Sequence, residues 1–275
     1  MNEDKRGILV VSFGTSRNDT YEKTLGAIEH EIRKAYSSYP VYRAWTSTKI
    51  RKKVQKQDGI SIYSVSEALE AMKKEGLQEI IVQPTYVVSG IEYERMKAEL
   101  QSAQQMNDRI EKREALTELK ITVGAPLLNT QEDCERIAAM LIDEWQIKES
   151  EMLILMGHGT EHALDRVYAE LNELLWAKGG TNRMIGTVQG NLNITELIKA
   201  VRCVQPQRII LAPFMIAAGV HAVHDMAGEQ ADSWKRILEK EGYEVTCVLK
   251  GLGEYRTVRQ IFLEHLNAAI QLLQE

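Results

Sequence analysis

The stretches IIVQPTYVVSGIE, residues 80–92, and IILAPFMIAAGVH, residues 209–221, are two copies of one segment. At a constant offset of about 129 residues, the copies share a proline and a glycine and differ in the polar residue that ends them. The matching pairs are Pro84 with Pro213, Gly90 with Gly219, and Glu92 with His221. This repeat predicts a chain built from two related halves.

A second pair of segments supports the duplication. LVVSFGT at residues 9–15 and ILMGHGT at residues 154–160 match at the glycine and threonine but differ at Phe13 and His158. The halves therefore carry different chemistry at matching strand ends. This asymmetry places the site where second-half strands open into loops, at His158 and His221.

Short β-branched apolar runs alternate with segments of helical spacing, which predicts parallel sheets with right-handed crossovers. The expected strands are Ile8–Phe13, Ile80–Gln83, Ile121–Gly124, Met152–Met156, Met184–Val188, Ile209–Leu211 and Val245–Leu249. The expected helices are Thr20–Ser37, Ser66–Glu75, Glu92–Gln105, Gln131–Gln146, Ala163–Ala177, Ile194–Val204, Asp232–Glu241 and Thr257–Leu273. The fold class is thus α/β, with two similar domains, each a parallel sheet flanked by helices.

The predicted domains are residues 1–126 and residues 127–275, and the second carries both site histidines. The last helix, about residues 257–273, could pack on either half. Pro84 and Pro213 lack the N–H that a central strand needs, so each should mark the carboxyl end of its strand. Ligands bind at that edge in open α/β sheets.

The bulk composition excludes several classes of function. Among 275 residues, 34 Lys and Arg stand against 39 Asp and Glu, and this net charge of −5 offers no general attraction for nucleic acid or anionic membranes. No signal-peptide pattern precedes the first strand, and the longest apolar stretch is too short to span a bilayer. We expect a cytoplasmic protein that binds neither nucleic acid nor membrane; a homo-oligomer is left open. Three scattered cysteines without CxxC spacing predict buried or half-buried thiols.

His158 lies between two glycines directly after a predicted strand, where the backbone can turn and leave the imidazole accessible. It could act as a ligand or base, or only cap the next helix. His221 and His224 are three residues apart and could share a helical face, but they lack a third ligand nearby in the sequence. We expect His224, and likewise His162, to be a supporting or surface residue.

Two histidines at strand ends of one sheet would face a common cleft between the halves. Neutral imidazole can bind a divalent metal or remove a proton near neutral pH. Glu92, the first-half counterpart of His221, would approach from the opposite wall. Its alternative role is that of an acidic residue in the first turn of a helix, stabilised by the helix dipole.

Seven motifs in register along nearly the whole chain carry a family resemblance: SFGTS at 12–16, VVSGIEYE at 87–94, MGHGTEH at 156–162, GTVQG at 186–190, AAGVHAVHDMA at 217–227, DSWK at 232–235 and GLGE at 251–254. Together they resemble the anaerobic cobalt chelatases of cobalamin biosynthesis, a class II chelatase family that inserts Co²⁺ into sirohydrochlorin or its precursor. The resemblance implies a duplicated chelatase-like fold that holds a sirohydrochlorin-type tetrapyrrole between its domains. Cobalt would be a substrate, with Fe²⁺ as the alternative, and no cofactor would be tightly bound.

The resemblance also implies site residues. The family's active-site histidines fall on His158 and His221, and its glutamate falls on Glu92. Where relatives often have an acidic third metal ligand, this chain has Gln189, which offers a carbonyl oxygen without a charge. The residues expected to bind the tetrapyrrole are Phe13, Gly14, Thr15, Ser89, Gly90 and Tyr93.

The carboxylate-rich rim of such a ring would need cations, for which the candidates are Arg17, Arg43, Lys49, Arg51 and Arg95. Two other functions are compatible with the same residues. One is iron insertion for sirohaem, because imidazole ligands accept both metals. The other is a non-catalytic protein that binds a tetrapyrrole or metal and has lost turnover with the change to Gln189.

Overall fold

The computed structural model describes residues 5–114, 119–159 and 166–273. The chain divides into two compact units, Met1–Leu127 together with Val258–Glu275, and Leu128–Thr257. The last helix, for which the sequence left both halves open, is thus counted with the first unit. The expected domain boundary after residue 126 stays a prediction.

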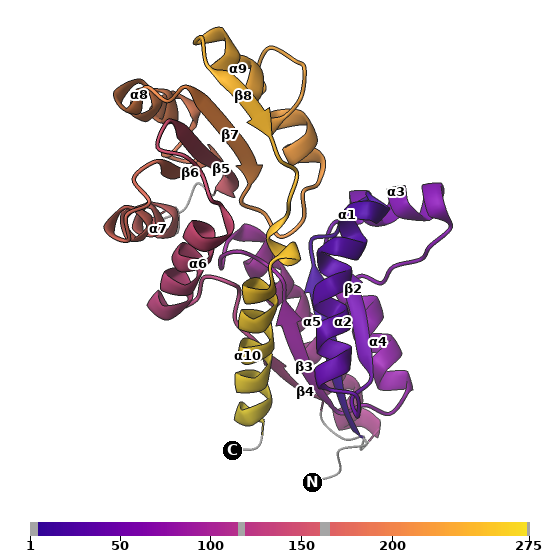
Figure 1. Cartoon of the computed structure of the whole chain (residues 1–275). Helices are drawn as coiled ribbons and strands as arrows, with labels where there is room; N and C mark the ends of the chain where they lie inside the picture. Colours follow the sequence, from indigo (N-terminus) through magenta and orange to yellow (C-terminus); the bar gives the residue numbers. More distant parts are fainter. Residues whose placement is uncertain (1–4, 115–118, 160–165, 274–275) are drawn as a thin grey trace. The chain divides into compact units, whose positions relative to one another are not determined.

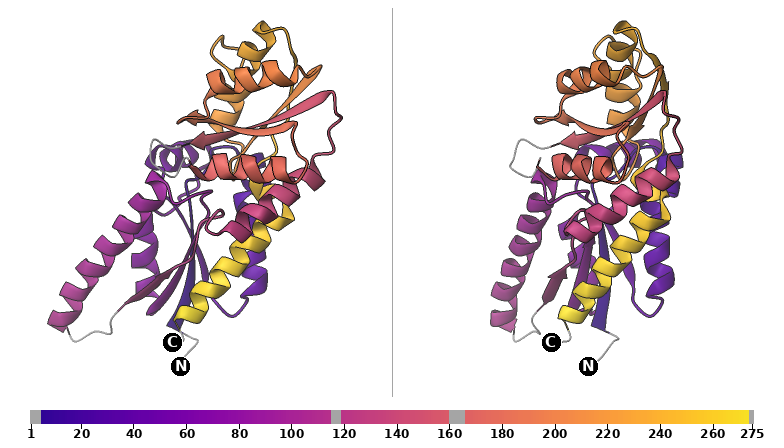
Figure 2. Two further views of the ribbon diagram at one scale, coloured as in Figure 1. Left: turned by 90° about the vertical axis from the view of Figure 1, so that its left-hand side faces the viewer. Right: turned by 60° about the vertical axis from the view of Figure 1, so that its left-hand side comes forward.

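The first unit is built on a parallel four-stranded sheet in the order β2-β1-β3-β4 (Figure 1). Its strands are β1 (Arg6–Ser12), β2 (Val41–Trp45), β3 (Glu79–Pro84) and β4 (Lys120–Val123). Its helices are α1 (Asn18–Lys23), α2 (Leu25–Ala35), α3 (Thr48–Asp58), α4 (Val65–Lys74), α5 (Ile91–Glu114) and α10 (Arg256–Leu272). Every residue of β1 is buried, as expected of a central strand covered on both faces. Figure 2 shows α5 on one side of this sheet and the yellow α10 on the other.

The second unit repeats this topology with a parallel sheet in the order β6-β5-β7-β8. Its strands are β5 (Glu151–Gly159), β6 (Arg183–Gln189), β7 (Arg208–Pro213) and β8 (Glu244–Cys247). Its helices are α6 (Gln131–Glu144), α7 (Arg166–Ala177), α8 (Ile194–Val204) and α9 (Trp234–Lys240), with short turns η3 (Ala222–Met226) and η4 (Leu252–Glu254). The shared strand order confirms the duplicated α/β fold that the repeat predicted.

Apolar side chains on alternate positions of β5 fill the core on one face of the second sheet. Met152, Ile154 and Met156 pack there with Leu197 of α8 and Met226 of η3. Side chains alternate between faces along a strand, so His158 continues this row at the carboxyl edge. The packing of this core therefore determines on which face of the sheet the His158 side chain projects.

The two prolines end their strands, as predicted: Pro84 is the last residue of β3 and Pro213 the last of β7. The sequence missed β2 and α3, however. β2 has only five residues, VYRAW, and α3 buries only Val54, so neither forms a recognisable apolar run. The units also differ here: two helices, α3 and α4, join β2 to β3, whereas α8 alone joins β6 to β7.

Two further expectations need correction, and a third cannot be compared with the structure. The single helix expected over Thr20–Ser37 is two helices separated at Thr24, whose hydroxyl donates to the Thr20 carbonyl oxygen at 2.6 Å. Cys203 is exposed rather than buried or half-buried, because it lies on the solvent side of α8. His162 and the expected start of a helix at Ala163 lie outside the described residues.

Candidate functional site

His158 is exposed at the carboxyl end of β5, where the backbone turns at Gly159. Gly159 has a φ of +76°, and a Cβ atom there would overlap the carbonyl oxygen of Gln189 on the neighbouring strand. Only glycine meets both demands without strain. Gly14, its counterpart after β1, has a φ of +100°. Both halves therefore keep the same turn, and the residues before these glycines, Phe13 and His158, carry the difference.

His221 follows β7 and immediately precedes the π-helical turn η3. Its Nδ1 lies 2.5 Å from Oδ2 of Asp225, one turn further along. A carboxylate at this distance favours the tautomer that carries its proton on Nδ1, which leaves Nε2 as the free electron pair. Asp225 thus orients the ring for binding a metal or accepting a proton through Nε2.

The rings of His158 and His221 form a pair, with centroids 5.2 Å apart and planes at 86°. Metal–imidazole bonds of about 2.0–2.1 Å place two ring centroids about 5 Å apart on one tetrahedral ion. The His221 side chain is 50% exposed, so the pair is accessible to an incoming ion. The structure therefore brings together the two histidines that the sequence singled out, within one unit.

Gln189 lies on β6, the strand next to the one that carries His158, but its side chain starts from the other face of the sheet. Its neighbour Val188 packs into the apolar cluster on the His158 face, so the exposed Gln189 side chain starts from the opposite face. Among the described residues, no group of three or more His, Cys, Asp and Glu side chains could hold a metal ion. A ligand role for Gln189 stays a prediction.

Glu92 lies in the first unit, in the first turn of α5, and accepts a 2.7 Å hydrogen bond from Arg95. An acidic residue at this position is stabilised by the helix dipole, which was the alternative reading of the sequence. The Glu92 side chain is nevertheless 36% exposed, and the Arg95 side chain 71% exposed, so the ion pair leaves the carboxylate accessible. Its part in metal insertion stays a prediction.

The residues expected to bind the tetrapyrrole gather at the carboxyl edge of the first sheet. Phe13 and Gly14 directly follow β1, and Ser89 and Gly90 follow β3. These two strands are paired, and their ends are joined by a buried 2.8 Å hydrogen bond between the hydroxyls of Thr85 and Ser12.

Phe13 is 43% exposed, which is unusual for a large apolar side chain and suits contact with a flat ring. Thr15 is buried, with its hydroxyl accepting from the Arg17 N–H, so it shapes the loop rather than presenting its side chain. Tyr93 packs edge-on against Tyr86, with centroids 6.4 Å apart, and burial raises the pKa of its phenol.

Several of the candidate cations already interact with other side chains of the first unit. Arg17 pairs with Asp19 at 3.1 Å, and Arg95 pairs with Glu92. Arg43 stacks over Tyr21 and Trp45 at 4.9 and 5.7 Å from the ring centroids. In the second unit, His224 is exposed, as expected of a surface residue.

Asp225 is not among the site residues predicted from the sequence. The signal was present in AAGVHAVHDMA, where an acidic residue four positions after a histidine lies on the same helical face.

Two similar α/β units with an imidazole pair at the strand ends of one define the class of metal chelatases. The chain belongs to the cobalt chelatase (CbiK) family, whose model matches residues 6–271. This confirms the resemblance read from the motifs, the fold class and the class of enzyme.

Individual relatives agree over nearly the full chain. The sirohydrochlorin cobaltochelatase of Salmonella typhimurium is 32% identical over 272 residues, covering 98% of both chains. The one from Nitratidesulfovibrio vulgaris is 32% identical over 277 residues, covering 98% of this chain and 93% of the relative. The structure of SirB from Bacillus subtilis with Fe³⁺ matches with a TM-score of 0.64 at 15% identity, covering 98% of each chain, and so supports the fold alone.

Proposed function

We propose that the protein inserts Co²⁺ into sirohydrochlorin. The observation that carries this proposal is the imidazole pair of His158, at the end of β5, and His221, just before η3, with ring centroids 5.2 Å apart. The names of the two relatives, both sirohydrochlorin cobaltochelatases, supply the substrate class.

Metal insertion requires the loss of two pyrrole N–H protons and the replacement of metal-bound water by ring nitrogens. His158 and His221 hold the incoming ion through a ring nitrogen that carries no proton, the form in which imidazole binds a divalent metal. As the ion passes to the ring, an imidazole is freed and accepts a pyrrole proton. One pair of residues thus performs both tasks in sequence.

Asp225 is a positioning residue in this scheme, because it touches His221 rather than the metal or the ring. It holds the imidazole in one orientation and stabilises the imidazolium that forms when His221 accepts a proton. Glu92 supplies negative charge or relays the second proton, and Gln189 contributes at most a neutral oxygen to the ion. We also propose that the protein is cytoplasmic.

Iron insertion into the same ring is the second candidate, because imidazole accepts Fe²⁺ as well as Co²⁺ and a structure of similar fold is described with Fe³⁺. A non-catalytic carrier would bind the ring and the ion without turnover. The experiment mixes purified protein with sirohydrochlorin and either Co²⁺ or Fe²⁺ and follows the visible spectrum against the spontaneous rate. We expect Co²⁺ insertion to be faster than the spontaneous reaction. If neither metal is inserted faster than it is spontaneously, the protein is no chelatase, and only the non-catalytic carrier function remains.

A further inference from the structure

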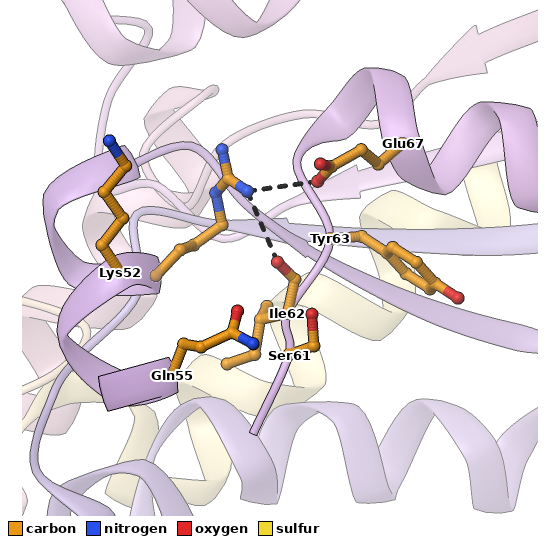
Figure 3. Close-up of a pocket in the computed structure, with 7 residues that line it drawn as sticks. Lys52, Gln55, Ser61, Ile62, Tyr63 and Glu67 are labelled. Carbon is orange, nitrogen blue, oxygen red and sulfur yellow. Dashed lines mark hydrogen bonds and ion pairs between the residues drawn. The ribbon is translucent and has the colours of Figure 1, made fainter. Parts of the chain in front are cut away.

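The first unit contains a pocket of about 230 Å³ whose lining residues all belong to that unit. It is lined by α3, by the segment that leads from α3 to α4, and by the first turn of α4: Arg51, Lys52, Gln55, Ser61, Ile62, Tyr63 and Glu67 (Figure 3). The segment runs beside β2, with the Trp45 N–H donating to the Tyr63 carbonyl at 2.9 Å. The pocket is therefore held by backbone contacts to the sheet.

Helix α3 is strongly basic in a chain of net negative charge. It carries one arginine and four lysines against a single aspartate, and the lysines are exposed: Lys49, Lys52, Lys53 and Lys56. Within the ranges that the structure covers, none of these lysines forms an ion pair. A local cluster of uncompensated cations attracts anions even when the whole protein does not.

Arg51 has one terminal nitrogen without a partner among the described residues. Its two hydrogen bonds both leave from Nη1, to Glu67 Oε2 at 3.1 Å and to the Ile62 carbonyl at 3.5 Å. Its Nε is buried and out of reach of a ligand, and Nη2 donates to none of the residues in the described part of the chain. A guanidinium N–H gives a charge-assisted hydrogen bond to a carboxylate, so Nη2 is left for an anionic ligand.

The pocket lies at the same sheet edge as the residues expected to bind the tetrapyrrole. Ser47, which caps α3, donates its N–H to the Phe13 carbonyl at 3.3 Å, and Arg51 is one helical turn further on. The hydroxyls of Thr46 and Tyr86 are 3.1 Å apart and tie the ends of β2 and β3 together. A ring packed against Phe13 would thus carry its side arms toward α3.

The second unit has no equivalent of α3 among its described elements, since α8 alone connects β6 to β7. The basic helix is therefore an addition to the repeated unit and not a requirement of the fold. An added element that brings five cations, one of them with an unpartnered terminal N–H, to a ligand-binding edge of the sheet is suited to recognising an anion.

We propose that this pocket binds a carboxylate side arm of the substrate, with Arg51 as the hydrogen-bond donor and Lys52 as the supporting charge. The inference rests on the proposed function, because sirohydrochlorin is the polycarboxylate concerned. Glu67 competes with the ligand for the same guanidinium, so the pocket is partly neutralised until the substrate arrives.

The test is a titration of metal-free sirohydrochlorin into wild type and three variants, followed by insertion kinetics. Arg51→Gln should weaken binding and raise KM about tenfold or more, the usual loss for a hydrogen bond between charged groups, while kcat changes less than about twofold. Arg51→Lys should give a smaller loss, because it keeps the positive charge without the planar guanidinium. Lys34→Gln is the matched control: it makes the same charge change at an exposed position in the last turn of α2.

A fourth variant predicts the opposite direction. Glu67→Gln keeps an oxygen for the Ser64 N–H that caps α4 but removes the charge that neutralises Arg51. Binding should tighten, a result that misfolding cannot imitate. If Arg51→Gln behaves like Lys34→Gln, or Glu67→Gln leaves affinity unchanged, the pocket is no carboxylate site.

Mellitate, a benzene ring with six carboxylates, separates this inference from the proposed function. In calorimetry we expect wild type to bind mellitate and Arg51→Gln to lose that binding. Mellitate binding that depends on Arg51, in a protein that never metallates sirohydrochlorin, would retain the site and refute the chelatase function. Unaltered mellitate binding in the variant, with normal metal insertion, would refute only the site.

Discussion

Replacing Asp225 should slow metal insertion far more than it destabilises the fold. The Asp225 side chain is 40% exposed and that of His221 50% exposed, so solvent screens their interaction. Ion pairs of this kind contribute less than about 1 kcal/mol to the free energy of unfolding. Loss of a partner that orients a metal-binding histidine, by contrast, typically costs about 10–100-fold in metal affinity or activity.

The two obvious substitutions should differ in a diagnostic way. Asp225→Ala leaves the imidazole free to sample both tautomers and should lower kcat/KM about tenfold, near the lower end of that range. Asp225→Asn can turn its amide NH₂ toward Nδ1, which stabilises the tautomer with its proton on Nε2 and blocks the nitrogen that binds the metal. We therefore expect the nearly isosteric Asn variant to be the slower enzyme, by about 100-fold or more relative to wild type.

The assay is the initial rate of Co²⁺ insertion, followed by absorbance, alongside thermal unfolding and ¹⁵N NMR of the His221 ring. Asp232→Asn, which removes an exposed carboxylate in the same unit, is the matched control and should match wild type. Asp225→Glu should recover part of the rate. Rates within about twofold of wild type for both Asp225 variants, or an unchanged His221 tautomer in Asp225→Asn, would refute the positioning role.

The remaining predictions concern the other site residues. His158→Ala and His221→Ala should each reduce insertion at least about 100-fold with the fold intact, because both side chains are exposed rather than part of the core. His224→Ala should stay near wild type. Near-normal turnover in either of the first two variants would remove that histidine from the mechanism. Glu92→Gln should slow insertion while tetrapyrrole binding persists, and unchanged kinetics would reduce Glu92 to a helix-terminal acid. Gln189→Glu should tighten Co²⁺ binding to the metal-only protein in calorimetry, and the gain should vanish when His158 is also replaced, because both would share one ion. Equal affinity for wild type and Gln189→Glu would show that this position is no ligand.

Much of the fold could be predicted from short sequence patterns, because each of these patterns reflects one local physical constraint on the backbone or on burial. The prolines at 84 and 213 end strands since they cannot donate to a central ladder, and both strands do end there. Elements without a continuous apolar face escaped prediction: α3 buries only Val54, and β2 exposes part of three of its five residues. Such elements owe their structure to the neighbours they pack on.

The sequence by itself determined the duplication and the parallel α/β fold, and it singled out His158 and His221 as candidates, because repeats, periodicity and flanking glycines can be recognised along the chain. Only the tertiary structure decided that the rings of His158 and His221 lie 5.2 Å apart, that Asp225 rather than His224 supports the pair, and that Gln189 starts from the opposite face of its sheet. Those facts depend on strand register and side-chain direction. Both are set by packing between segments far apart in sequence, so no local pattern encodes them.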